Sequence, residues 1–152
     1  MTIDLRTILI AEDNPFDVEL TLDALSSHHL ANSVTVVSDG VETLEYLRRE
    51  GRFADRSPEP PAVLLLDLKM PRMDGLEVLR EIRSDPALRM QPVVMLTSSR
   101  EDSDLAASYD LGVNAYVVKP VEFTEFVKAI GETGVFWGVI NEGPPRTGDD
   151  DG

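Results

Sequence analysis

The sequence has 152 residues, of which 28 are acidic and 14 are basic, so its formal net charge is −14 at pH 7. This length corresponds to one domain that can bury a core without disulfides or a structural metal. The absence of cysteine excludes disulfide frameworks and thiolate zinc sites, and the acidity argues against binding to nucleic acids or anionic membranes, which require basic surfaces.

Five short apolar runs alternate with segments in which apolar residues have helical spacing. The runs cover residues 7–11, 34–37, 62–66, 92–96 and 115–118. Most of them are continuous rather than alternating, which is typical of strands covered on both faces. The helical segments are marked by Phe16, Val18, Leu20, Leu22, Ala24 and Leu25, by Val41, Leu44 and Leu47, by Leu76, Leu79 and Ile82, by Leu105, Ala106 and Tyr109, and by Phe123, Phe126, Val127, Ile130 and Trp137. This alternation predicts a doubly wound α/β fold with a parallel sheet between two helical layers.

Two segments are predicted to be irregular. Residues 52–61 carry three prolines, which favours a long surface loop before the central strand. Residues 142–152 have no apolar anchor, so we expect a disordered acidic tail after a domain that spans residues 1–141. Gly131 and Gly134 weaken the end of the last helix.

The apolar runs are much shorter than the roughly 20 residues that a membrane span requires. The first seven residues also lack the basic start and apolar core of a signal peptide. We therefore expect a cytoplasmic protein.

Four of the five predicted strands lead directly into polar or charged residues. The first run is followed by Glu12 and Asp13, the third by Asp67, the fourth by Thr97 and the fifth by Lys119. Ligands of open parallel sheets bind beyond the carboxyl ends of the strands. With the strand order 2-1-3-4-5, all of these side chains would meet at one edge.

Three carboxylates brought together in this way require a proton or a cation. Two unit charges about 4 Å apart repel each other by roughly 4 kcal/mol at an effective dielectric constant near 20. An all-oxygen cluster suits Mg²⁺. A carboxylate, a divalent metal, a lysine and a hydroxyl are the groups that handle a phosphoryl group, and the carboxylate itself can be the nucleophile that forms an aspartyl phosphate.

Each of these residues also has a purely structural interpretation. Asp13 or Asn14 could cap the first helix, Thr97 could begin a helix, Lys119 could be a solvated surface charge, and Asp67 could belong to a turn. Their joint occurrence at four strand ends favours a shared site.

In four motifs the sequence resembles the receiver domain of bacterial two-component response regulators. The motifs are ILIAEDN at residues 8–14, LLLDLKMPRMDG at 64–75, VVMLTSS at 93–99 and NAYVVKP at 114–120. The resemblance extends over about residues 6–140 and implies a flavodoxin-like fold with a five-stranded parallel sheet in the order 2-1-3-4-5.

The resemblance also implies roles for the acidic residues. Asp67 matches the aspartate that accepts the phosphoryl group. Asp13 matches a direct Mg²⁺ ligand, Glu12 a ligand that acts through water, and Lys69 the residue whose backbone carbonyl binds the metal.

The remaining matches concern the switch. Thr97 matches the hydroxyl that turns toward the phosphoryl group, Tyr116 the aromatic residue that then rotates inward, and Lys119 the lysine that pairs with a phosphoryl oxygen. The peptide bond between Lys119 and Pro120 is cis in the family, although few X-Pro bonds are cis in general.

The family function is a phosphorylation switch rather than an enzyme with external substrates. A sensor histidine kinase would donate the phosphoryl group to Asp67, and the protein would catalyse only its own phosphorylation and dephosphorylation. Because no effector domain is visible in the sequence, we expect the signal to leave through a changed protein–protein surface.

A narrower resemblance is to the small regulators paired with phytochrome-type sensor kinases. It rests on the loop at 51–61, the run at 108–116, and Phe136 and Trp137 after the last helix. Such regulators are often homodimers through the fourth helix, the fifth strand and the fifth helix, an interface that Phe136 and Trp137 could extend. Alternatively, these two residues could close the bottom of the core.

Three other functions deserve comparison. A phosphohydrolase of the haloacid dehalogenase type would need a second aspartate where Lys69 stands, and an NTPase would need a glycine-rich phosphate loop that the sequence lacks. A phosphate sink without conformational output fits the same motifs. The sequence leaves open the downstream target, the lifetime of the phosphorylated state, whether the sensor acts as kinase or phosphatase, and the oligomeric state.

Overall fold

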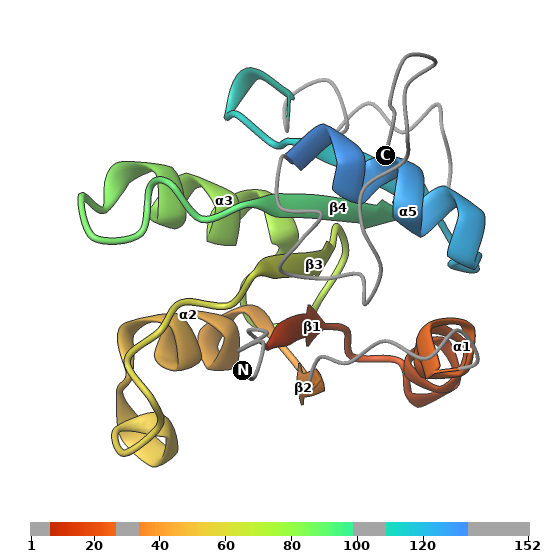
Figure 1. Ribbon diagram of the computed structural model, residues 1–152. Coiled ribbons are helices and arrows are strands. Elements are labelled where there is room, and N and C mark those ends of the chain that lie inside the picture. The colour runs from red at the N-terminus through yellow and green to blue at the C-terminus, as the bar shows by residue number, and fades with distance from the viewer. Residues whose placement is uncertain (1–6, 27–33, 99–108, 134–152) are drawn as a thin grey trace, which may run out of the picture.

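A computed structural model describes residues 7–26, 34–98 and 109–133 (Figure 1). A five-stranded parallel sheet lies at its centre, with the strand order β2-β1-β3-β4-β5. The strands are β1 (Ile8–Ala11), β2 (Val34–Val37), β3 (Val63–Asp67), β4 (Val93–Thr97) and β5 (Ala115–Val118). The helices are α1 (Pro15–Ser26), α2 (Gly40–Arg48), the short 3-10 helix η1 (Gly51–Phe53), α3 (Gly75–Ser84) and α5 (Phe123–Thr133). The predicted fold class and strand order are therefore confirmed.

Helices cover both faces of the sheet. In Figure 1, α1 and α5 lie on one side of the strands, and α2 and α3 lie on the other. Each face has its own apolar core: Leu25 and Phe126 pack on the first face, and Leu44, Leu79 and Ile82 pack on the second. The two cores separate the strand residues by alternation, as the two-residue period of a strand requires.

The burial of each strand follows its place in the sheet. Every residue of the central strands β1, β3 and β4 is buried, whereas the edge strands β2 and β5 include half-buried positions. The third and fourth strands end one residue later than predicted, because Asp67 pairs with Leu96 and Thr97 pairs with Val118. The sheet itself thus holds two of the predicted site residues.

The two helices on the second face of the sheet, α2 and α3, each have an aspartate as N-cap residue. Asp39 accepts a hydrogen bond from the backbone N–H of Glu42 at the start of α2. Asp74 and Glu77 form a reciprocal capping box at the start of α3, which satisfies backbone donors that a helix terminus leaves unpaired.

The predicted apolar stripe of the first helix is wrong at its first residue. Phe16 is 65% exposed, whereas Thr21 and Leu25 are buried against the sheet. The stripe fails because α1 buries the face that carries Thr21, Leu22 and Leu25, and Phe16 in the first turn lies outside that face.

The predicted loop at residues 52–61 is partly regular. Its first residues belong to η1, and Arg56 donates hydrogen bonds to the backbone oxygens of Tyr46 and Leu47. Pro61 at its end is buried. Apart from Phe53, Arg56 and Pro61, residues 52–61 are exposed, so the predicted surface position is confirmed, and Arg56 anchors the segment to α2.

Several predictions lie outside the described residues. They concern most of the fourth helix, of which only Tyr109 and Asp110 are described, as well as Phe136, Trp137 and the tail at 142–152. Among the helices that are described, none has the length and apolar character needed to cross a membrane.

Candidate functional site

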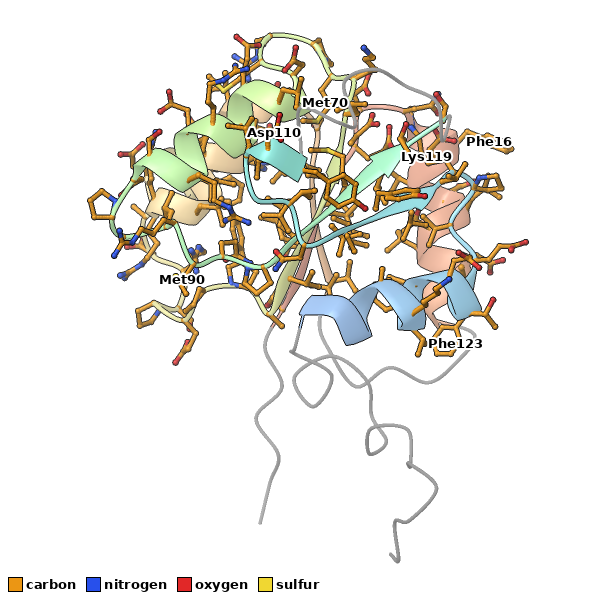
Figure 2. All side chains as sticks on the ribbon, turned by 90° about the horizontal axis from the view of Figure 1, so that it is seen from above. Phe16, Met70, Met90, Asp110, Lys119 and Phe123 are labelled. Atoms are coloured by element: carbon orange, nitrogen blue, oxygen red, sulfur yellow. The ribbon has the colours of Figure 1, made fainter. Side chains whose placement is uncertain are left out.

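The carboxyl ends of four strands form an acidic cleft. The cleft has a volume of about 160 Å³. It is lined by Glu12, Asp13, Asn14, Asp17, Asp67, Leu68, Lys69, Thr97, Ser98 and Lys119. Figure 2 shows Lys119 at this end of the sheet, next to the first turn of α1 that carries Phe16. The predicted convergence of strand ends is thus present in the structure.

Three carboxylates of the cleft form a compact cluster. One oxygen each from Glu12, Asp13 and Asp67 lies within 4.8 Å of the other two. Glu12 is 2% exposed and Asp67 is 3% exposed, whereas Asp13 faces solvent. The all-oxygen donor set and the open side at Asp13 fit a hard divalent cation that keeps several waters, as Mg²⁺ does.

Lys119 places one ammonium group among the carboxylates. Its Nζ lies 3.1 Å from Glu12 Oε1, 3.1 Å from Asp17 Oδ2 and 3.3 Å from Asp67 Oδ1. Burial on its own lowers the pKa of Lys119, but the charge of Asp67 and the hydrogen bonds to Asp17 and Glu12 outweigh it, so the pKa lies above its usual range. The lysine is therefore a fixed positive charge.

The backbone orients Lys119 toward this cluster. Its N–H donates to the carbonyl oxygen of Thr97 at 2.7 Å, which continues the pairing of β5 with β4. The following peptide bond to Pro120 is cis, as the resemblance to receiver domains implied.

The environment of Asp67 raises the pKa of its carboxyl to about 7. Burial is the largest cause, the nearby charge of Glu12 adds to it, and the ammonium of Lys119 opposes both. A carboxyl in this position gains from any additional positive charge, because that charge offsets the cost of keeping Asp67 ionised.

Two further predicted residues line the cleft, and one does not. Thr97 is buried at the end of β4, and Lys69 follows Asp67 by two residues in the β3–α3 loop. Tyr116 does not line the cleft, and its half-buried ring packs with the core of the second face of the sheet. Its ring contacts that of Tyr109 edge to face, with 6.1 Å between centroids.

The structural interpretation of the acidic motif applies to Asn14. The Asn14 side chain accepts hydrogen bonds from the backbone N–H groups of Phe16 and Asp17 at the start of α1. Its own N–H donates to Glu12 Oε2 at 3.1 Å. Asn14 thus acts as a helix cap and leaves Asp13 facing the cleft.

Asp17 is a cleft residue that sequence reasoning missed. It lies in the first turn of α1 and bonds to Lys119. The available signal was its place in the first turn of the helix that begins just after Glu12 and Asp13, which keeps it at the same end of the sheet.

The backbone of Asp67 is packed closely against α3. The Gly75 N–H donates to the carbonyl oxygen of Leu68 at 3.0 Å. A Cβ at Gly75 would lie 2.5 Å from the carbonyl oxygen of Asp67 and 2.9 Å from Leu68 Cα. The glycine that ends the second sequence motif is therefore needed for this close approach.

Comparisons with known proteins agree on one family. The family model described as "Response regulator receiver domain" matches residues 8–131. The chain is 35% identical over 132 residues to "Response regulator Rcp1" of Synechocystis sp., a match that covers 87% of this chain and 88% of the relative.

Solved structures are similar over nearly the whole chain. The bacteriophytochrome response regulator AtBRR is 58% identical, with a TM-score of 0.85 over 92% of this chain and all of the other. The phosphorylated cyanobacterial phytochrome response regulator RcpA is 40% identical, with a TM-score of 0.72 over 88% and 94% of the two chains. The Mn²⁺-bound form of Rcp1 is 32% identical, with a TM-score of 0.71 over 93% and 99%.

Proposed function

Because the chain belongs to the family of response regulator receiver domains, we propose that it is a signalling switch in which Asp67 accepts a phosphoryl group from a sensor histidine kinase. The observation that carries this proposal is the contact of Lys119 Nζ with Asp67 Oδ1, at 3.3 Å, inside a cluster of carboxylates. This arrangement combines a nucleophilic carboxylate with a fixed positive charge at a concave, water-accessible site.

The proposed step is a direct phosphoryl transfer. A carboxylate oxygen of Asp67 attacks the phosphorus of a phosphohistidine, the P–O bond forms as the P–N bond breaks, and the imidazole leaves with the electron pair of that bond. Lys119 stabilises the negative charge of the transferring group. The raised pKa of Asp67 means that this carboxylate needs compensating positive charge to be ionised at neutral pH.

The cluster of carboxylates supports binding of Mg²⁺. Asp13 and Asp67 would bind the ion directly, Glu12 through water, and Lys69 through its backbone carbonyl. When bound, the ion supplies positive charge that lowers the repulsion between the carboxylates and the incoming phosphoryl oxygens.

Thr97 and Tyr116 would convert phosphorylation into a surface change. Thr97 lines the cleft beside Asp67, so its hydroxyl can turn to a phosphoryl oxygen. Tyr116 lies on β5, which pairs with the strand β4 that carries Thr97, and its half-buried ring contacts the ring of Tyr109. We infer that movement of Thr97 lets the Tyr116 ring turn inward, which alters the surface around β5 and α5.

The partner would be a kinase of the phytochrome type. This proposal is supported by the names of the relatives, which include a bacteriophytochrome response regulator and a cyanobacterial phytochrome response regulator. We also propose a homodimer through a face that includes β5 and α5 with Phe136 and Trp137. The kinase makes its phosphohistidine from ATP, which supports a cytoplasmic location.

A phosphate sink without conformational output is the second candidate that the site chemistry supports. Both functions place the phosphoryl group on Asp67, and neither turns over an external substrate. Lys69 stands where a phosphohydrolase of the haloacid dehalogenase type would need its acid, and it lines the cleft, so repeated hydrolysis of external phosphoesters is disfavoured.

The first test is the intact mass of the protein after incubation with acetyl phosphate, with and without Mg²⁺. We expect the mass of one phosphoryl group to be added to the wild type with Mg²⁺ and to be absent from Asp67→Asn. Size-exclusion chromatography of the phosphorylated protein then separates a switch, whose oligomeric state or partner binding changes, from a sink, in which nothing changes. An adduct that persists in Asp67→Asn would contradict the proposal.

A further inference from the structure

The ammonium of Lys119 has one partner that the proposed function does not use. Glu12 and Asp67 belong to the carboxylate cluster, but Asp17 approaches Lys119 from α1 without being part of that cluster. We propose that Asp17 is a positioning residue that holds Lys119 in the unphosphorylated protein and competes with the phosphoryl group for its ammonium. This inference rests on the proposed function of Asp67.

Three carboxylates surround the ammonium of Lys119, and it donates hydrogen bonds to two of them, Glu12 and Asp17. An ammonium has three N–H donors, and three carboxylates lie 3.1, 3.1 and 3.3 Å from Nζ. The Lys119 side chain is only 15% exposed, so bulk water has little access to it. Once Asp67 carries a phosphoryl group, the phosphoryl oxygens compete for this ammonium with the two carboxylates that remain, Glu12 and Asp17, and they gain its full charge only as one of those contacts weakens.

Burial decides which partner is released. The Glu12 side chain is 1% exposed, and its second oxygen accepts the N–H of Asn14, so it is buried and held on two sides. The Asp17 side chain is 24% exposed. Because an ionised carboxylate that loses its partner is far less costly near water than in the interior, Asp17 is the partner that gives way.

The charge of Asp17 also opposes phosphorylation. The cleft is lined by more acidic than basic residues, and an acyl phosphate carries more negative charge than the carboxylate it replaces. Asp17 therefore disfavours the phosphoryl group by repulsion and by holding Lys119. The same charge favours a divalent cation at the neighbouring carboxylates.

These two effects have opposite signs for two ligands that can be measured separately. Asp17→Asn has nearly the same shape and keeps an oxygen that can accept from Lys119, but it removes the charge. We expect it to tighten the binding of beryllofluoride, which mimics a phosphoryl group on a carboxylate, and to weaken the binding of Mg²⁺. A merely structural role, such as fixing the start of α1, would weaken both ligands together.

The experiment is calorimetric titration of the full chain with Mg²⁺ alone, and with beryllofluoride at saturating Mg²⁺. The matched control is Glu19→Gln, which removes one charge from an exposed position of the same helix. For Asp17→Asn we expect about five- to tenfold tighter beryllofluoride binding and about three- to tenfold weaker Mg²⁺ binding, and for Glu19→Gln less than about a twofold change in either. Asp17→Glu, which restores the charge, should return both affinities toward the wild type.

The outcomes separate this inference from the proposed function. If the wild type binds beryllofluoride but Asp17→Asn leaves both affinities unchanged, or weakens both, the role of Asp17 is wrong and the role of Asp67 stands. If the wild type with Mg²⁺ does not bind beryllofluoride at all, the proposed function fails and this inference fails with it. Should Asp17→Asn not fold by circular dichroism, Asp17→Ser provides the same loss of charge with the same expected signs.

Discussion

Lys119 Nζ lies 3.3 Å from Asp67 Oδ1, although Asp67 is the last residue of β3, Lys119 directly follows β5, and β4 separates these two strands in the sheet. The parallel register explains the contact. Asp67 pairs with Leu96, and Thr97 pairs with Val118, so the three strands end at nearly the same level. Lys119 then extends over the end of β4 to reach a carboxylate two strands away.

Loss of the lysine charge should impair phosphorylation more than it impairs folding. In Lys119→Gln the carboxylates lose their shared cation, and the transferring group loses its stabilising charge. We expect the rate of phosphorylation by acetyl phosphate to fall by at least about tenfold, measured by intact mass over time. Lys128→Gln, at an exposed position of α5, is the control; equal rates in the two variants would remove Lys119 from the mechanism.

Removal of the Asp67 carboxyl should stabilise the metal-free protein. The folded state holds the proton of Asp67 up to a pKa of about 7, well above the usual range for aspartate. The folded form therefore binds more protons than the unfolded form between about pH 4 and pH 7, and stability falls as pH rises through that window. Above pH 7 the full penalty is present.

We accordingly expect Asp67→Asn in EDTA at pH 8 to be about 2–4 kcal/mol more stable than the wild type, with a smaller difference at pH 5. Urea denaturation at the two pH values measures it. With saturating Mg²⁺ the difference in stability between Asp67→Asn and the wild type should shrink, because only the wild type can bind the ion with all three carboxylates. A variant less stable than the wild type at pH 8 would show that Asp67 is not under strain.

A methyl group at residue 75 should disturb the site from behind. The Cβ in Gly75→Ala would lie 2.5 Å from the carbonyl oxygen of Asp67, so either α3 or the end of β3 must move. We expect a loss of about 1–3 kcal/mol in the free energy of unfolding, together with slower phosphorylation. Because Gly112 has open space apart from the flexible side chain of Arg83 but a positive φ, Gly112→Ala is a useful comparison: it should lower stability while leaving phosphorylation intact.

Arg83 should contribute to stability through hydrogen bonds to backbone oxygens. Its guanidinium donates to the carbonyl oxygens of Arg89, Gln91 and Gly112, which joins the α3–β4 connection to the segment before β5. Burial lowers the pKa of this guanidinium.

Arg83→Met keeps the apolar stem but leaves those carbonyls without their donor, at a cost of about 2–3 kcal/mol. Thermal unfolding compares it with Arg80→Met, at an exposed position of the same helix. Similar melting temperatures for the two variants would contradict the role of Arg83.

The meeting of site residues at the strand ends was predictable, because each polar or charged residue directly follows an apolar run and a parallel sheet brings these ends to one edge. The contact of Asp17 with Lys119 and the exposure of Phe16 were not predictable. Both depend on how α1 is rotated about its axis, and the spacing of its apolar residues does not fix that rotation. The contacts of Arg83 join segments that are distant along the chain and carry no local pattern. In the loop at 51–61, the prolines gave no indication of η1.

The measurement that tests the central claim most directly is the location of the phosphoryl group. After phosphorylation with acetyl phosphate and Mg²⁺, borohydride reduction converts a phosphoaspartate to homoserine, and peptide mass spectrometry locates that residue. We expect homoserine at position 67 of the wild type and at none of the other aspartate positions. Modification of Asp13 or Asp17 instead, or a phosphoryl group on a residue outside the cleft, would contradict it.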